Sequence, residues 1–182
     1  MPIKDQMIAW WGPIIHEYYG ATEGGVAVNR DAALPQTFQI LDTSDQLSAI
    51  KRVMKVMNVD DEKFPPKQVM GYINSCKEEG LRAHSVDAYD PHSQRMREIF
   101  DEYDKQCQRE GVVDFGELML RSYELLRDND AIRLHYRARF KHVLIDEFQD
   151  TNKLQYAWIK MIAGLPAEHG SAVLAVGDDD QS

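Results

Sequence analysis

The sequence predicts an α/β protein in which a mostly helical region precedes part of a parallel β-sheet. In the middle of the chain, apolar residues recur at spacings of three and four, which is typical of amphipathic helices. Further on, two short runs rich in Val, Ile and Leu flank one helical segment, and this strand, helix, strand order favours a parallel sheet. With 182 residues, 43% hydrophobic and 28% charged, the chain is long enough for one domain with a sizeable core.

The first two helices are expected over residues 43–58 and 64–80. The segment "TSDQLSAIKRVMKVMN" opens with a capping-box pattern formed by Thr43 and Gln46. The segment "FPPKQVMGYINSCKEEG" begins with prolines suited to a first helical turn and ends at Gly80. On these two helices, the side chains that we expect to face the apolar core are those of Leu47, Ile50, Met54, Met57, Val69, Ile73 and Cys76.

Three more segments of the middle region read as helices. Residues 92–110 form the longest, with Gly111 as the stop signal. The segment "VDFGELMLRSYELL" offers Asp114 as an N-cap, and a short helix is expected through "DAIRLHYRARF". The side chains expected to be buried are Met96, Phe100, Tyr103, Cys107, Phe115, Leu118 and either Leu125 or Leu126.

Both predicted strands end in carboxylates. "HVLIDEF" contains Asp146 and Glu147, and "SAVLAVGDD" leads into Asp178, Asp179 and Asp180; a helix over 152–163 separates the two runs. Parallel α/β sheets bind ligands at the carboxyl ends of their strands, so two neighbouring strands would direct acids into one crevice. Because close carboxylates repel one another, a bound Mg²⁺ would stabilise such a cluster.

A hydrophobic strand followed by Asp-Glu is the Walker B pattern of nucleotide hydrolases, in which the Asp holds Mg²⁺ and the next acid activates water. Two plainer interpretations remain open on these residues alone. The acids could be solvated residues at an ordinary strand end, or Asp150 and Thr151 could only cap the following helix.

A longer comparison of motifs narrows the choice. "DEFQDTNKLQYAWI" followed by "AVGDDDQS" resembles motifs II and III of the superfamily 1 DNA helicases of the UvrD, PcrA and Rep type. Upstream, "VDFGELML" and "LPQTFQILDTSDQL" resemble segments that precede motif II in that family. The resemblance implies a helical insertion subdomain over 30–138, which touches duplex DNA in those enzymes. It also implies an incomplete RecA-like ATPase subdomain of the P-loop NTPase type over 139–182.

The resemblance also implies roles for individual residues. Asp146 is expected to bind the Mg²⁺ of ATP, and Glu147 to act as the general base. Gln149 and Asp150 are expected to link the nucleotide site to neighbouring loops, and Gln181 to sense the γ-phosphate. The cofactors expected of the intact family member are therefore ATP and Mg²⁺, and its expected partner is DNA at a junction of single strand and duplex.

The sequence lacks the P-loop pattern that would cradle the phosphates, since no Gly is followed by Lys and no Lys by Ser or Thr. The expected function is therefore a fragment of an ATP-dependent DNA helicase that is inactive as an isolated chain. One alternative is a noncatalytic helical module that binds DNA or a protein partner.

Residues 1–29 carry a separate resemblance. "YYGATEGG" resembles the Y-G-x-T-E motif of adenylate-forming enzymes such as acyl-CoA synthetases, with Tyr19, Gly20, Thr22 and Glu23 at the matching positions. One interpretation of that likeness is that the chain is a relic of an adenylating enzyme. The other is that residues 1–29 are an N-terminal tail unrelated to the rest of the chain.

Charge and cysteine content restrict the remaining classes. The formal charge of −9, from 21 basic and 30 acidic residues, argues against a wholly electrostatic nucleic-acid binder, although residues 132–142 are locally positive. Cys76 and Cys107 lack a C-x-x-C spacing, which suits a reducing cytoplasm. No apolar run approaches the ~20 residues of a membrane span. We expect a cytoplasmic protein without a membrane anchor.

Overall fold

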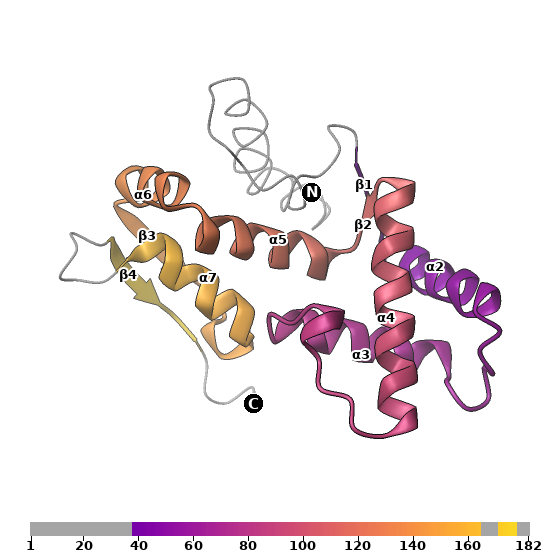
Figure 1. The fold of residues 1–182 in the computed structure, drawn as a ribbon. Coiled ribbons are helices and arrows are strands. Elements are labelled where there is room, and N and C mark those ends of the chain that lie inside the picture. The colour runs from indigo at the N-terminus through magenta and orange to yellow at the C-terminus, as the bar shows by residue number, and fades with distance from the viewer. Residues whose placement is uncertain (1–37, 165–170, 178–182) are drawn as a thin grey trace.

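The computed structural model describes residues 38–164 and 171–177, and Figure 1 shows how their helices and strands are arranged. The helices are α2 (Thr43–Val56), α3 (Pro66–Glu78), α4 (Pro91–Glu110), α5 (Phe115–Asp128), α6 (Asp130–Arg139) and α7 (Lys153–Ala163). The strands are β1 (Gln39–Ile40), β2 (Val112–Val113), β3 (His142–Ile145) and β4 (Ala172–Ala175), and two short 3₁₀ turns are η3 (Ala83–Ser85) and η4 (Phe148–Asp150). The fold is therefore mostly helical with small parallel sheets.

The predicted helices are confirmed, and their ends follow from local sequence. Asp90 and Ser93 form a capping box at the start of α4, and Gly111 ends that helix with a left-handed φ of 65°. The expected cap of α2 is wrong by one residue. Asp42 accepts a hydrogen bond from the Asp45 backbone N–H at 2.8 Å and caps the helix in place of Thr43.

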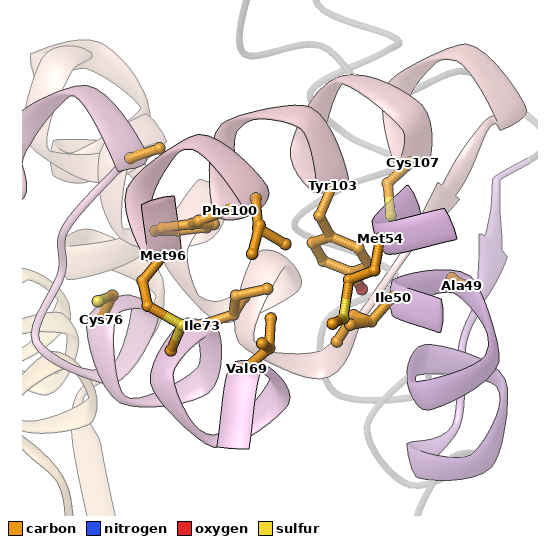
Figure 2. Close-up of a cluster of buried hydrophobic side chains, with 12 residues drawn as sticks. Ala49, Ile50, Met54, Val69, Ile73, Cys76, Met96, Phe100, Tyr103 and Cys107 are labelled. Atoms are coloured by element: carbon orange, nitrogen blue, oxygen red, sulfur yellow. The ribbon is translucent and has the colours of Figure 1, made fainter. Parts of the chain in front are cut away.

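The first apolar core lies where α2, α3 and α4 meet, and Figure 2 shows its side chains. The amphipathic faces predicted from spacing supply most of it. Its buried members are Ala49, Ile50, Met54, Val69, Ile73, Cys76, Ala83, Met96, Ile99, Phe100, Tyr103 and Cys107. Each of these three helices therefore buries its one apolar stripe in the same core, as a spacing of three and four residues requires.

A second core joins α5, α6, α7 and β3. Its buried members are Met119, Leu120, Leu126, Tyr136, Leu154, Trp158 and Ile162, with Val143 of β3 partly buried against them. The indole N–H of Trp158 donates to the Ser122 hydroxyl at 2.7 Å, which fixes α7 against α5 and satisfies the buried donor. Trp158 is thus a packing residue of the second core.

The predicted parallel pairing is confirmed. Strands β3 and β4 pair in parallel, with His142 opposite Ala172 and Ile145 opposite Ala175. The side chains of these two strands are less buried than their apolar character suggested. Leu144 of β3 and Leu174 of β4 are 68% and 57% exposed. A second parallel pair, β1 with β2, was not predicted, because two residues per strand are too few to show a period.

No helix among the described residues is both long enough and apolar enough to cross a membrane. The boundary between subdomains expected near residue 138 stays a prediction.

Candidate functional site

The acidic residues after β3 lie in a turn that is bonded to the segment after β4. The Val176 backbone N–H donates to the Ile145 carbonyl at 2.8 Å, which extends the ladder one residue beyond β4. The Phe148 N–H then donates to the Val176 carbonyl at 2.9 Å. The two strand ends therefore hold one another, and the Asp146–Glu147 step lies at the carboxyl edge of the parallel pair, where α/β sheets bind ligands.

Glu147 has an unusual backbone conformation, with φ 51° and ψ 45°. A left-handed residue other than Gly costs about 1 kcal/mol or more, and such residues cluster at functional sites. Its N–H donates to the Asp146 carboxylate at 3.1 Å, and its own carboxylate accepts from the Gln149 side-chain amide at 2.5 Å. The first contact orients the Asp146 carboxylate, and the second orients the Glu147 carboxylate.

Gly177 allows the segment after β4 to approach the turn after β3 closely. A Cβ atom at this position would lie 2.6 Å from Gln149 Oε1 and 3.6 Å from the Phe148 Cβ. Any larger residue would therefore displace the Gln149 side chain. Sequence reasoning did not single out Gly177, although a glycine directly after a strand is a recognised signal of close backbone approach.

The structure brings together four of the expected site residues: Asp146, Glu147, Gln149 and Asp150. Asp150 belongs to η4, where its N–H donates to the Glu147 carbonyl at 2.9 Å. The interpretation in which Asp150 or Thr151 caps the next helix is wrong. Asn152 is the N-cap of α7 and forms a capping box with Gln155.

Other expected residues lie outside the part of the chain that the structure describes. They are Gln181, Asp178, Asp179 and Asp180 of the second motif, and Tyr19, Gly20, Thr22 and Glu23 of the N-terminal motif.

The donor set suits a metal shared with phosphate better than a metal held by protein alone. Within residues 38–164 and 171–177, no three His, Cys, Asp or Glu side chains are grouped so that they could hold a metal ion. Asp146, Glu147 and Asp150 are exposed at one strand end. Mg²⁺ commonly takes one or two protein carboxylates and completes its shell with water and substrate phosphates, so these residues fit a nucleotide-bound Mg²⁺.

Part of the locally positive stretch 132–142 makes hydrogen bonds within the protein. The Arg137 guanidinium donates to the Met161 carbonyl at 2.8 Å, and that of Arg133 donates to the Leu126 carbonyl at 2.7 Å. Tyr136 is buried in the second core. Two of the arginines that could have approached a phosphate backbone therefore bind helix carbonyls.

The fold and the site define a class of protein: an α/β protein with a helical unit before a parallel strand pair whose carboxyl edge presents acids. A family model described as the UvrD/REP helicase N-terminal domain matches residues 14–182. The chain belongs to this family.

Individual relatives agree with that assignment. The chain is 50% identical over 157 residues to DNA helicase II of Escherichia coli, covering 86% of this chain and 21% of that protein. It is 49% identical over 153 residues to DNA helicase II of Haemophilus influenzae, covering 84% and 20%. It is 33% identical over 160 residues to the ATP-dependent DNA helicase PcrA of Staphylococcus aureus strain Mu50, covering 85% and 21%. The chain thus spans about a fifth of the length of these relatives.

The resemblance to adenylate-forming enzymes receives no support from the comparisons. The helicase family match begins at residue 14 and so includes the Y-G-x-T-E residues themselves.

Proposed function

We propose that this chain is a segment of an ATP-dependent DNA helicase, in which ATP hydrolysis drives the unwinding of DNA in the cytoplasm. Membership of the UvrD/REP family and the helicase names of the relatives support the proposal. The observation that carries it is the carboxyl edge of β3 and β4, where Asp146 and Glu147 follow β3 directly and the turn that contains them is hydrogen-bonded to Val176 after β4.

In this proposal the carboxylates have distinct roles. Asp146 binds Mg²⁺, and the bound ion neutralises charge on the ATP phosphates. Glu147 accepts a proton from the attacking water. The Gln149 side-chain amide donates a hydrogen bond to one oxygen of the Glu147 carboxylate. The other oxygen of that carboxylate is therefore the one that accepts the proton from the water. Gln149 and Asp150 link this site to the adjoining turns, and Gln181 responds to the γ-phosphate.

The proposal divides the chain into three parts. Residues 30–138 form the helical insertion subdomain that contacts duplex DNA near its junction with a single strand. Residues 139–182 form part of a RecA-like subdomain of the P-loop NTPase type, and residues 1–29 precede both. The phosphate-binding loop has no counterpart in the printed sequence, so we expect the 182-residue chain alone to hydrolyse ATP at a negligible rate.

The test uses the intact protein that contains this chain. Replacing Glu147 with Gln removes the base but keeps its size and its ability to bond Gln149. General-base catalysis typically contributes 10²–10⁴-fold, so we expect DNA-stimulated ATP hydrolysis to fall by about that factor while ATP binding persists. The matched control is Glu62→Gln, an exposed residue of the loop before α3. Retention of near-normal turnover by Glu147→Gln would refute the assigned role.

A further inference from the structure

The two apolar cores are joined by a buried cluster of charged side chains. The first core belongs to α2, α3 and α4, and the second to α5, α6, α7 and β3. In Figure 1, α5 and α7 lie together on one side of the molecule, and α2, α3 and α4 on the other. The charged cluster contains the cations Lys77, Arg82 and Arg121 and the acids Asp104, Asp114, Glu117 and Glu124.

Lys77 of α3 is the centre of this cluster. Its side chain is only 1% exposed, and its ammonium lies 2.9 Å from Asp114, 3.1 Å from Glu117 and 3.0 Å from Asp104. Burial by itself lowers the pKa of Lys77, but the three carboxylates together raise it above its usual range. Tyr103 of α4 also donates to Asp114 at 2.9 Å. The N-terminus of α5 is thus held by side chains from α3 and α4.

Arg82 forms the second connection across the same boundary. Its guanidinium donates to Glu117 at 2.8 Å and, through two nitrogens, to both oxygens of Glu124 at 2.9 and 2.6 Å. Both carboxylates belong to α5, whereas Arg82 directly precedes η3. A smaller apolar cluster of Ile40, Val113 and Leu118 lies at the β1–β2 side of this boundary. The contact between the two cores therefore depends heavily on ion pairs.

A boundary made of buried ion pairs adds little to the stability of the fold, but it suits movement of the two cores relative to each other. Replacing a buried ion-pair network with apolar residues is often neutral or stabilising, because desolvation offsets much of the Coulomb attraction. Polar interfaces between folded units commonly permit relative motion, whereas large apolar ones do not. A cleft of about 450 Å³ between α4 and α5, lined by Arg82, Asp104, Glu117 and Glu124, brings solvent to the cluster.

The cluster has four acids for three cations, so one negative charge is uncompensated when all are ionised. Asp104 is its most exposed acid, at 22% of the side chain. The groups that act on it most strongly are Lys77 from α3, Arg82 from the segment before η3 and Glu117 from α5. The same cleft is also lined by His84 of η3 and by Arg121 and Arg127 of α5. Burial, reinforced by Glu117, outweighs the two cations and raises the pKa of Asp104 from 3.8 to about 6. A proton on Asp104 therefore balances the charge of the cluster in the arrangement that the structure shows, which we call closed.

We propose that this cluster is a proton-sensitive joint, at which α5 and the elements after it part from α3 and α4 as one body while both cores stay folded. Protonation of Asp104 closes the joint, and ionisation of Asp104 loosens it. The sign follows from linkage: the closed form binds the proton more tightly than the parted form, in which Asp104 faces water, so rising pH favours parting. For the shift given above, the ratio of parted to closed molecules rises about tenfold between pH 5 and pH 7.

The test measures the distance between the two units in the full 182-residue chain. Fluorophores on Val56→Cys of α2 and Lys160→Cys of α7 report it by energy transfer, and both positions are exposed. The native thiols should not react, because burial raises the pKa of Cys107 to about 12 and also raises that of Cys76. The ratio of parted to closed wild-type molecules should rise about tenfold from pH 5 to pH 7, and in Asp104→Asn this ratio should change less than twofold.

Two further variants keep the result interpretable. Asp101→Asn is the matched control, since Asp101 lines the same cleft on α4 but pairs with Lys105 of its own helix; its profile should match the wild type. Glu124→Gln removes a carboxylate that holds Arg82 and should raise the parted population at pH 5. Circular dichroism confirms that each variant is folded. A wild-type distance that is constant with pH, or an Asp104→Asn profile equal to the wild type, overturns the proposal.

Discussion

At the scale of single residues, Lys77 shows how strongly one side chain can depend on partners distant in sequence. Its ammonium bonds Asp114, which is 37 residues away, and that carboxylate also caps α5 by accepting from the Glu117 N–H at 2.7 Å. Removing the cation would leave the carboxylates of Asp114 and Glu117, which are only 3% and 6% exposed, without the ammonium that compensates their burial. The cost of breaking such a pair greatly exceeds the net value of the intact pair.

We therefore expect Lys77→Met to lower the free energy of unfolding by about 3–5 kcal/mol, measured by urea denaturation of the chain. The control is Lys63→Met, which removes an exposed lysine whose only described ion pair, to Asp60, spans 4.0 Å; its effect should be below about 1 kcal/mol. Equal midpoints for the two variants would show that the buried cluster contributes nothing specific.

The charged cluster also marks a limit of sequence reasoning at this scale. Asp114 was correctly predicted as a helix cap, because its position before an apolar repeat is a local signal. Its ion pair with Lys77 could not be predicted, since nothing in the spacing on α3 distinguishes a buried lysine from one at the edge of the helix face. Likewise Gln46 was expected to complete a capping box, but its side-chain amide donates to Asn74 of α3 at 2.7 Å.

At the scale of elements, α7 connects the candidate site to the second core. It begins just after η4, and its Asn152 cap accepts from the Gln155 N–H at 2.9 Å while the Gln155 side chain accepts from the Asn152 N–H at 3.0 Å. Its middle is held against α5 by Trp158, whose indole N–H donates to the Ser122 hydroxyl. The helix therefore determines where the turn containing the carboxylates lies.

Asn152→Ala should lower the free energy of unfolding by about 1 kcal/mol, because the Gln155 backbone N–H loses its partner at the start of α7. Amide hydrogen exchange in residues 153–156 should accelerate more than exchange in α4. An Asn152→Asp variant keeps an oxygen acceptor at the cap and should restore most of the protection. If exchange accelerated equally in all helices, the cap would have no local role.

The helices were predictable because each combines an apolar repeat with a start or stop residue, such as Asp90 and Gly111 for α4. The parallel pairing of β3 with β4 was predictable from the strand, helix, strand order. The left-handed turn at Glu147 was not, because its conformation depends on the hydrogen bonds to the segment after β4. Local pattern specifies elements, whereas the geometry between elements requires long-range contacts.

At the scale of the whole molecule, the charged cluster makes stability depend on pH in a specific window. Asp104 has a pKa raised to about 6 by burial, so its contribution is present below its unfolded value of 3.8 and is lost as pH rises through 6. Glu117 acts in the opposite direction, because the nearby cations hold its pKa below the usual range even though burial alone would raise it. Its contribution is lost only under more acidic conditions, below its usual value of 4.5.

Between pH 5 and pH 7, the free energy of unfolding of the wild-type chain should therefore fall by about 1 kcal/mol through Asp104 alone. Asp104→Asn should abolish that part of the slope, whereas Asp101→Asn should retain it. Urea denaturation at several pH values measures the effect. A slope in Asp104→Asn that equals the wild-type slope would assign the pH dependence to other groups.

The proposed function also belongs to this scale, because the chain covers about a fifth of its relatives and the carboxylates at β3 would act on a nucleotide bound by the intact protein. The most direct test is the Mg²⁺ concentration that gives half-maximal, DNA-stimulated ATP hydrolysis in that protein. If Asp146 is a Mg²⁺ ligand, Asp146→Asn should raise this concentration at least about tenfold, as loss of a charged ligand from a divalent cation site implies. An unchanged Mg²⁺ requirement in Asp146→Asn would contradict the role of the β3 carboxylates as the metal site.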